Sequence, residues 1–196
     1  DLNSLLRRTR IVSGFILFFY AATHLLNHSL ATFSISTADA AREYFIAFWR
    51  NPAAEIFLFA SFALHILLGI QAVLRRKSFK MTKREWLQMT FPFVALLALI
   101  PHVLTTAILS RMFAVTDNYE LIFAATLIDP SKASKNVIFF SLMVVLIWTH
   151  GVIGIHGLLK TKPLYARLRQ TIIGFYWAVP TPVSYTHLTL PTNDQV

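Results

Sequence analysis

The hydrophobic positions of this chain come in long blocks separated by short polar segments. Blocks of this kind are typical of helices that cross a bilayer, where about 20 apolar residues span a hydrocarbon core of about 30 Å. We place four spans at residues 11–33, 53–74, 90–112 and 136–159. A fifth apolar run begins near Thr171 and stops at Val179. The pattern predicts an all-α transmembrane helix bundle with four complete spans and a truncated fifth.

The segments between the spans predict a few further features. Residues 34–52 are polar, and we expect a short interfacial helix over 36–43 with Trp49 at headgroup level. The third span contains Pro92 and Pro101. Because a proline removes one helical hydrogen bond and kinks the helix, we expect a bend around His102. Residues 113–135 form a mixed-charge loop with room for a short helix.

Composition supports a membrane protein and sets its orientation. The chain is 56% hydrophobic and only 14% charged, with a net charge of +9. Of its 18 Lys and Arg residues, 13 lie in the N-terminal segment and in the loops 75–84 and 160–169. The positive-inside rule therefore predicts a multi-pass protein with a cytoplasmic N-terminus. Because the basic residues lie at span ends, we expect the lipid bilayer as partner and no nucleic acid.

The absence of cysteine excludes several kinds of metal site. A thiolate zinc site, a cysteine-ligated iron–sulfur cluster and a covalently attached c-type haem cannot be built. Any metal centre must use other ligands, and histidine is the natural candidate.

Each of the four spans carries a histidine near mid-depth, at His24, His65, His102 and His150. A polar side chain at that depth is costly unless something holds it. At a rise of about 1.5 Å per residue, His24 and His102 lie about 18–20 Å from the cytoplasmic edge. His65 and His150 lie about 14 Å from that edge. The depths predict an outer pair, His24 with His102, and an inner pair, His65 with His150.

Paired imidazoles on facing helices are what two stacked b-type haems require. Each iron takes one imidazole from each of two helices, and such an iron moves electrons rather than binding oxygen. We therefore predict two haem b groups with these four histidines as iron ligands. Two alternatives stay open: hydrogen bonds of single histidines across helices in a haem-free transporter or scaffold, and a proton or metal pathway. The pathway is weakened because no Asp or Glu lies in the middle of a span.

Four neighbours of these histidines are candidate binding residues. Gly69 and Gly154 each lie four residues after a histidine, on its helical face. The missing side chain would admit either a flat macrocycle or a neighbouring helix, and both readings stay open. His28, one turn after His24, is expected to hydrogen-bond near the outer haem edge, or to replace His24. His156, near the cytoplasmic boundary, would contact water, a haem propionate or a quinone.

Four arginines lie near span boundaries. A guanidinium there could pair with haem propionates, and lipid headgroup binding is the ordinary alternative. These residues are Arg8, Arg10, Arg50 and Arg111.

The histidine segments resemble those of a known family. One histidine on each of four spans is similar to the dihaem cytochrome b anchor of succinate dehydrogenase and fumarate reductase, the succinate:quinone oxidoreductases. A closer resemblance is to the dihaem-b membrane anchor of bacterial class III adenylate/guanylate cyclases. The segments that carry it, within about residues 5–180, are Arg8-x-Arg10-Ile-Val-Ser-Gly, His24-Leu-Leu-Asn-His28, Phe48-Trp-Arg-Asn-Pro52 and Trp148-Thr-His150-Gly-Val-Ile-Gly-Ile-His156.

The resemblance implies a redox sensor in the bacterial inner (plasma) membrane. It implies the same outer and inner ligand pairs, exchange of electrons with the quinone pool, and a cytosolic cyclase domain beyond this chain. We further expect a homodimer. No paired metal-binding aspartates of a cyclase occur here, so we assign no catalytic residue. The alternative is a respiratory cytochrome b subunit with the same haems.

The end of the chain differs in character from the rest. Residues 182–196 resemble translated sequencing-adapter sequence and are left out of fold reasoning. We therefore expect one dihaem-binding anchor domain over residues 1–181, truncated at its C-terminal end.

Overall fold

The computed structural model describes residues 1–114, 118–121, 130–160 and 162–178, and its elements there are all helices. In chain order they are α1 (Leu2–Ser29), η1 (Leu30–Thr32, a 3-10 turn), α2 (Ile35–Trp49), α3 (Pro52–Leu74), α4 (Lys83–Val103), η2 (Leu104–Leu109, a π-helix), α5 (Ser110–Met112), α7 (Pro130–Leu159) and α8 (Pro163–Ala178). Parts of the predicted 113–135 loop and the whole of 182–196 lie outside the described residues.

Four helical segments are long and apolar enough to cross a membrane, as predicted. They are Leu2–Thr32, Pro52–Leu74, Lys83–Ile108 and Ser131–Leu159. Large apolar side chains such as Phe57, Leu67 and Leu97 point outward, with exposed fractions of 67%, 62% and 77%. Because such a surface is unfavourable in water, it is suited to lipid. The chain is an all-helical, multi-pass membrane protein.

Helix capping extends the helices beyond the apolar runs. α4 begins at Lys83, earlier than the predicted 90, because Thr82 and Glu85 form a capping box. Thr82 Oγ1 accepts from the Glu85 N–H at 3.3 Å, and Glu85 Oε2 accepts from the Thr82 N–H at 2.8 Å. α8 also begins earlier than predicted, at Pro163 rather than near Thr171.

The interfacial helix is longer than predicted and is tied to the bundle. α2 runs from Ile35 to Trp49, and Ser34 caps it by accepting from the Thr37 N–H at 3.0 Å. Trp49 is only 8% exposed, and its Nε1 donates to Thr23 Oγ1 on α1 at 3.1 Å. It therefore attaches α2 to α1, in contrast to the expected headgroup anchor.

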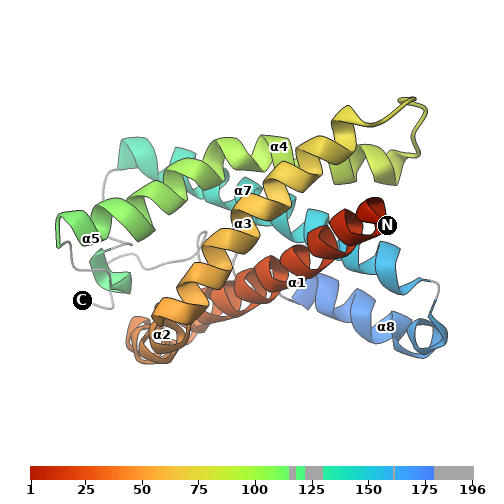
Figure 1. Cartoon of the computed structure of the whole chain (residues 1–196). Helices are drawn as coiled ribbons and strands as arrows, with labels where there is room; N and C mark the ends of the chain where they lie inside the picture. Colours follow the sequence, from red (N-terminus) through yellow and green to blue (C-terminus); the bar gives the residue numbers. More distant parts are fainter. Residues whose placement is uncertain (115–117, 122–129, 161, 179–196) are drawn as a thin grey trace.

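The spans form an up-and-down bundle made of two helix pairs. α1 packs along α3, and α4 packs along α7. In Figure 1 the N-terminus, the α3–α4 turn and the C-terminal end of α7 lie at one end, while α2 and α5 lie at the other. α8 returns beside α7, where the indole Nε1 of buried Trp148 donates to the Tyr176 carbonyl at 2.8 Å. The four predicted histidines sit on four different helices of this bundle.

The two prolines of the third span are accommodated inside the helix. α4 stays helical through Pro92 and Pro101, and the backbone changes to the π-helix η2 directly after Val103. Thr106 Oγ1 donates to the His102 carbonyl at 2.7 Å. The irregularity expected near His102 therefore takes the form of a π-helical segment, a feature that is frequent at functional sites.

Candidate functional site

The inner histidines face each other across the two helix pairs. His65 of α3 and His150 of α7 have ring centroids 6.1 Å apart, with their planes at 78°. Both side chains are partly buried.

The outer histidines show nearly the same separation. His24 of α1 and His102 of α4 have ring centroids 6.2 Å apart, with their planes at 59°. The structure thus brings together the same two pairs that depth along the sequence suggests, each pair with one ring from α1 or α3 and one from α4 or α7.

Backbone carbonyls fix the orientation of both inner rings. His65 Nδ1 lies 3.1 Å from the Arg10 carbonyl oxygen, and His150 Nδ1 lies 3.1 Å from the Gln88 carbonyl oxygen. A carbonyl oxygen can only accept, so each Nδ1 carries the hydrogen and donates it. In the neutral rings the lone pair is therefore on Nε2, the nitrogen that would bind a metal. Histidine ligands are commonly held in this way from the second ring nitrogen.

Two residues of α1 that the sequence did not single out as site residues, Gly14 and Ser13, form the surface against which the His65 ring packs. A Cβ added at Gly14 would lie 2.8 Å from His65 Cε1, closer than real side chains approach. Ser13, 3% exposed, has its Oγ 3.4 Å from His65 Nδ1 and donates to the Arg10 carbonyl at 3.1 Å. Both residues belong to the motif Arg8-x-Arg10-Ile-Val-Ser-Gly that the sequence analysis singled out, and that was the available signal.

The outer pair has a third imidazole beside it. His28 Nε2 lies 3.2 Å from His24 Nε2, so one ring nitrogen donates to the other. The His28 ring is edge-on to Tyr119, with centroids 5.2 Å apart. Buried Asn27 donates from Nδ2 to the Tyr119 hydroxyl at 2.6 Å. Ligation by His24 would require this His24–His28 contact to open, whereas the inner pair has its Nδ1 atoms, not Nε2, in the contacts with Arg10 and Gln88.

The two candidate glycines lie in different surroundings. A Cβ at Gly154 would lie 3.4 Å from Gln88 Nε2, so this position allows α4 to approach α7 closely. A Cβ at Gly69 would meet nothing within 4 Å. Gly151, which the sequence did not single out, is the tightest of the three, because its Cβ would lie 2.5 Å from Phe18 Cδ2.

The candidate arginines are spread over several places. Arg8 is exposed, while Arg10 and Arg50 are half-buried. Arg10 meets the inner pair through its backbone carbonyl. Arg111 pairs with Glu55 at the start of α3, with Nη1 2.5 Å from Oε1. Arg111 therefore has a carboxylate partner within the bundle.

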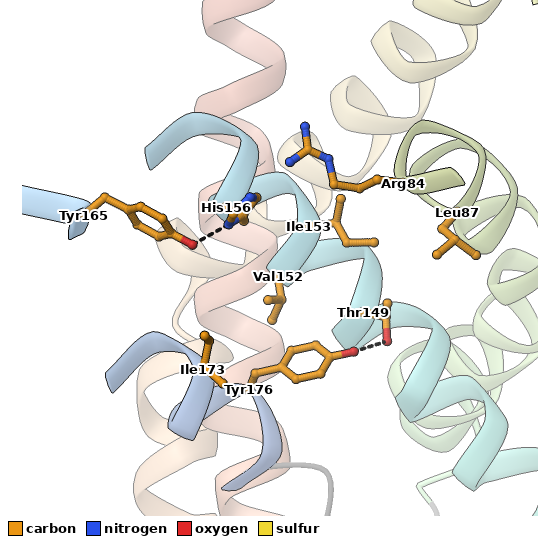
Figure 2. Close-up of a pocket in the computed structure, with 9 residues that line it drawn as sticks. All are labelled: Arg84, Leu87, Thr149, Val152, Ile153, His156, Tyr165, Ile173 and Tyr176. Carbon is orange, nitrogen blue, oxygen red and sulfur yellow. Dashed lines mark hydrogen bonds between the residues drawn. The ribbon is translucent and has the colours of Figure 1, made fainter. Parts of the chain in front are cut away.

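His156 lines a cavity of about 310 Å³ between α4, α7 and α8. Figure 2 shows Tyr165 and Tyr176 of α8 reaching α7 at two points of this cavity, where they hydrogen-bond with His156 Nδ1 and Thr149 Oγ1. Thr149 immediately precedes His150. The lining residues are Arg84, Leu87, Thr149, Val152, Ile153, His156, Tyr165, Ile173 and Tyr176.

The histidine pairs fit a metal that takes two protein ligands. An imidazole nitrogen binds a first-row metal at about 2 Å, so two rings on opposite sides of one metal have centroids about 6 Å apart. The separations of 6.1 and 6.2 Å meet this requirement. Within the described residues no group of three or more His, Cys, Asp or Glu gathers as a metal site. Two ligands per site suit a haem, whose macrocycle supplies the other four nitrogens.

A second observation beside the inner pair also fits a bound group. Gln88 Oε1 is buried and has no hydrogen-bond partner in the part of the chain that the structure describes. An acceptor left unpaired costs about 1–3 kcal/mol, which a donor on a bound molecule or water would offset.

Comparison with family models, with curated proteins and with solved structures finds no match for this chain.

Proposed function

We propose that this chain is a membrane-embedded dihaem b domain that senses or transfers electrons with the quinone pool. The observation that carries the proposal is the presence of two facing imidazole pairs at the separation that a shared iron requires. His65 and His150 would hold the inner haem, and His24 and His102 the outer one. When bound between two histidines, each haem would supply one-electron exchange.

The protein's own part is to hold neutral imidazoles in one orientation inside an apolar bundle. The Arg10 and Gln88 carbonyls keep Nδ1 protonated on both inner histidines, which leaves Nε2 as the donor to a metal. Two levels of paired rings along the bundle would give an electron path between its two ends.

Single alanine substitutions test the pairing. His65→Ala and His150→Ala should each remove the same haem, and His24→Ala and His102→Ala should each remove the other. Reduced-minus-oxidised absorption spectra with redox titration distinguish the two haems. His156→Ala is the matched control and should retain both.

Two results would refute the proposal. One is purified wild-type protein without reduced b-type absorption bands, which would favour a haem-free transporter or scaffold. The other is loss of one haem common to His65→Ala and His24→Ala, which would exclude the pairing by level.

For the quinone we propose the cavity beside α8. Its lining is mostly apolar, and the His156–Tyr165 and Thr149–Tyr176 contacts offer polar groups to a headgroup. Thr149 adjoins His150, so a headgroup there would lie near the inner pair. The double variant His156→Leu, Tyr165→Phe removes both polar groups of the His156–Tyr165 contact. We expect the apparent affinity for quinol to fall about tenfold, the effect of one lost hydrogen bond.

The measurement is the rate of haem reduction at increasing quinol concentration. Reduction by dithionite is the internal control, because it needs no quinone site and should not change. An unchanged quinol dependence would place quinone elsewhere and leave the haem assignment standing.

We also propose that, in the full-length protein, this domain regulates a cytosolic nucleotide cyclase domain, as a homodimer in a bacterial inner membrane. Reduction of a haem held between the helix pairs would change the charge there. Because the surroundings have a low dielectric constant, this change would alter the energy with which the two pairs pack. α7 carries His150 and leads to α8, so its displacement would reach the end of the bundle where α8 begins. Reduction can shift the equilibrium between two arrangements of the helices only as far as it stabilises one arrangement more than the other.

The genomic reading frame beyond residue 181 separates the two redox candidates. A cyclase coding sequence would support a sensor. A stop codon within the membrane region, next to genes for a flavoprotein and an iron–sulfur subunit, would support a respiratory cytochrome b.

A further inference from the structure

The hydrogen bond that orients His150 uses a carbonyl of α4 that a regular helix would not leave available. In an α-helix each carbonyl accepts from the N–H four residues later. For Gln88 that residue is Pro92, which has no N–H. The structure remains helical through Pro92, so the Gln88 oxygen lacks its usual helical donor and accepts from His150 Nδ1 at 3.1 Å instead.

We propose that Pro92 is a positioning residue for the inner histidine pair. By removing one main-chain donor, it leaves the Gln88 carbonyl as the partner of His150 and so fixes this imidazole as the Nδ1–H tautomer. The lone pair then lies on Nε2. Pro92 thus acts on the site through Gln88 and His150, without contacting the metal.

The packing around Gln88 agrees with a close and ordered contact at this point. Gly154, one turn after His150, lets Gln88 Nε2 approach to 3.4 Å from the place where a Cβ would lie. α4 and α7 are also one of the two closely packed helix pairs. Gln88 therefore meets α7 twice, through its backbone carbonyl at His150 and through its side-chain amide at Gly154.

The same reasoning gives a matched control in the same helix. Pro101 also removes a helical donor, in this case that of the Leu97 carbonyl, which lies about two and a half turns after Gln88. Pro101 adjoins His102 of the outer pair. Pro92→Ala and Pro101→Ala are thus the same chemical change, one directed at each pair.

The part of the inference that concerns iron rests on the proposed function, and the part that concerns the tautomer does not. A carbonyl that accepts from Nδ1–H raises the basicity of a histidine ligand, and loss of such a partner weakens metal binding about 10- to 100-fold. Pro92→Ala restores an N–H that competes for the Gln88 carbonyl. We expect an upward shift of the inner midpoint potential and weaker retention of the inner haem.

The experiment measures both quantities in this chain purified in detergent. Redox titration gives the two midpoint potentials in wild type, Pro92→Ala and Pro101→Ala. In haem-free protein labelled with ¹⁵N-histidine, NMR gives the tautomer of His150, assigned by its loss in His150→Ala. We expect a single Nδ1–H tautomer in wild type and in Pro101→Ala, and a mixture in Pro92→Ala.

Each outcome counts for or against the inference. An unchanged His150 tautomer in Pro92→Ala, with an unchanged inner potential where haem is bound, would overturn it. An equal shift of the inner potential by Pro101→Ala would also overturn it, since the effect would then be a general one of helix straightening. Absence of b-type bands from wild type would refute the proposed function, and the tautomer would still decide the role of Pro92.

Discussion

At the scale of single residues, the inner site depends on a missing side chain, a serine hydroxyl and a backbone carbonyl, none of which is a metal ligand. The absent side chain of Gly14 lets the His65 ring lie against α1, within reach of the Arg10 carbonyl. Ser13 donates to the same carbonyl from its Oγ, so the oxygen has two side-chain donors from two helices. A buried polar group of this kind is stable because its hydrogen bonds are satisfied.

Gly14→Ala tests this contact between α1 and the His65 ring. The added Cβ would lie 2.8 Å from His65 Cε1, so the ring must move away from α1 or the helices must separate. We expect overpacking to cost about 1–3 kcal/mol. Under the proposed function, the inner haem should then be lost while the outer haem stays. Haem content per protein and the reduced spectrum report both effects. Gly157→Ala is the matched control, because a Cβ there meets nothing within 4 Å and should leave both haems in place.

The difference between His65 and Gly14 shows what the sequence can reveal at this scale. An imidazole inside an apolar run is visible because its burial is costly without a partner. Gly14 is not visible in this way, because its importance comes from a side chain of another helix that lies 51 positions later in the chain. The Gln88 carbonyl is less visible still, since every residue has one.

At the scale of helices, apolar runs locate the spans, but capping decides where they begin. Residues 83–89 are polar enough to be read as loop, yet the capping box of Thr82 and Glu85 starts α4 there. The length of α2 likewise depends on the Ser34 cap and on the contact of Trp49 with α1. Hydropathy records only where lipid can be tolerated, so it could not give these boundaries.

The outer end of the bundle is held together by buried hydrogen bonds between helices. Asn27 of α1 donates to Tyr119, and the Tyr119 N–H donates to Asp39 Oδ1 of α2 at 2.9 Å. Tyr119 is 3% exposed and also contacts the His28 ring. Tyr119 therefore connects α1 and α2 beside the outer histidines.

Tyr119→Phe removes the hydroxyl and keeps the ring. Because buried Asn27 loses its 2.6 Å partner, we expect the free energy of unfolding to fall by about 1–3 kcal/mol. Thermal unfolding in detergent, followed by circular dichroism, measures the loss. Tyr44→Phe is the control, since Tyr44 is 81% exposed and should be neutral. Equal stability of the two variants would show that the Asn27–Tyr119 bond contributes little.

At the scale of the whole molecule, the basic residues gather at the end of the bundle from which the depths of the histidines are measured. The basic residues gather near the N-terminus, the α3–α4 turn and the C-terminal end of α7, which lie together at one end of the bundle in Figure 1. The inner pair was assigned by its distance from that end. Orientation in the membrane therefore decides which haem would face the cytoplasm, and it can be measured without any haem.

The lack of native cysteine makes this measurement direct. Ser78→Cys puts a thiol in the exposed α3–α4 turn, and Ser36→Cys puts one at the exposed start of α2. By the positive-inside rule, a membrane-impermeant maleimide should label Ser36→Cys in intact cells and Ser78→Cys in inverted vesicles. The unsubstituted chain should not be labelled in either preparation. The reverse pattern would put the 75–84 loop outside, and the pair His65 and His150 would then lie nearer the external face than His24 and His102.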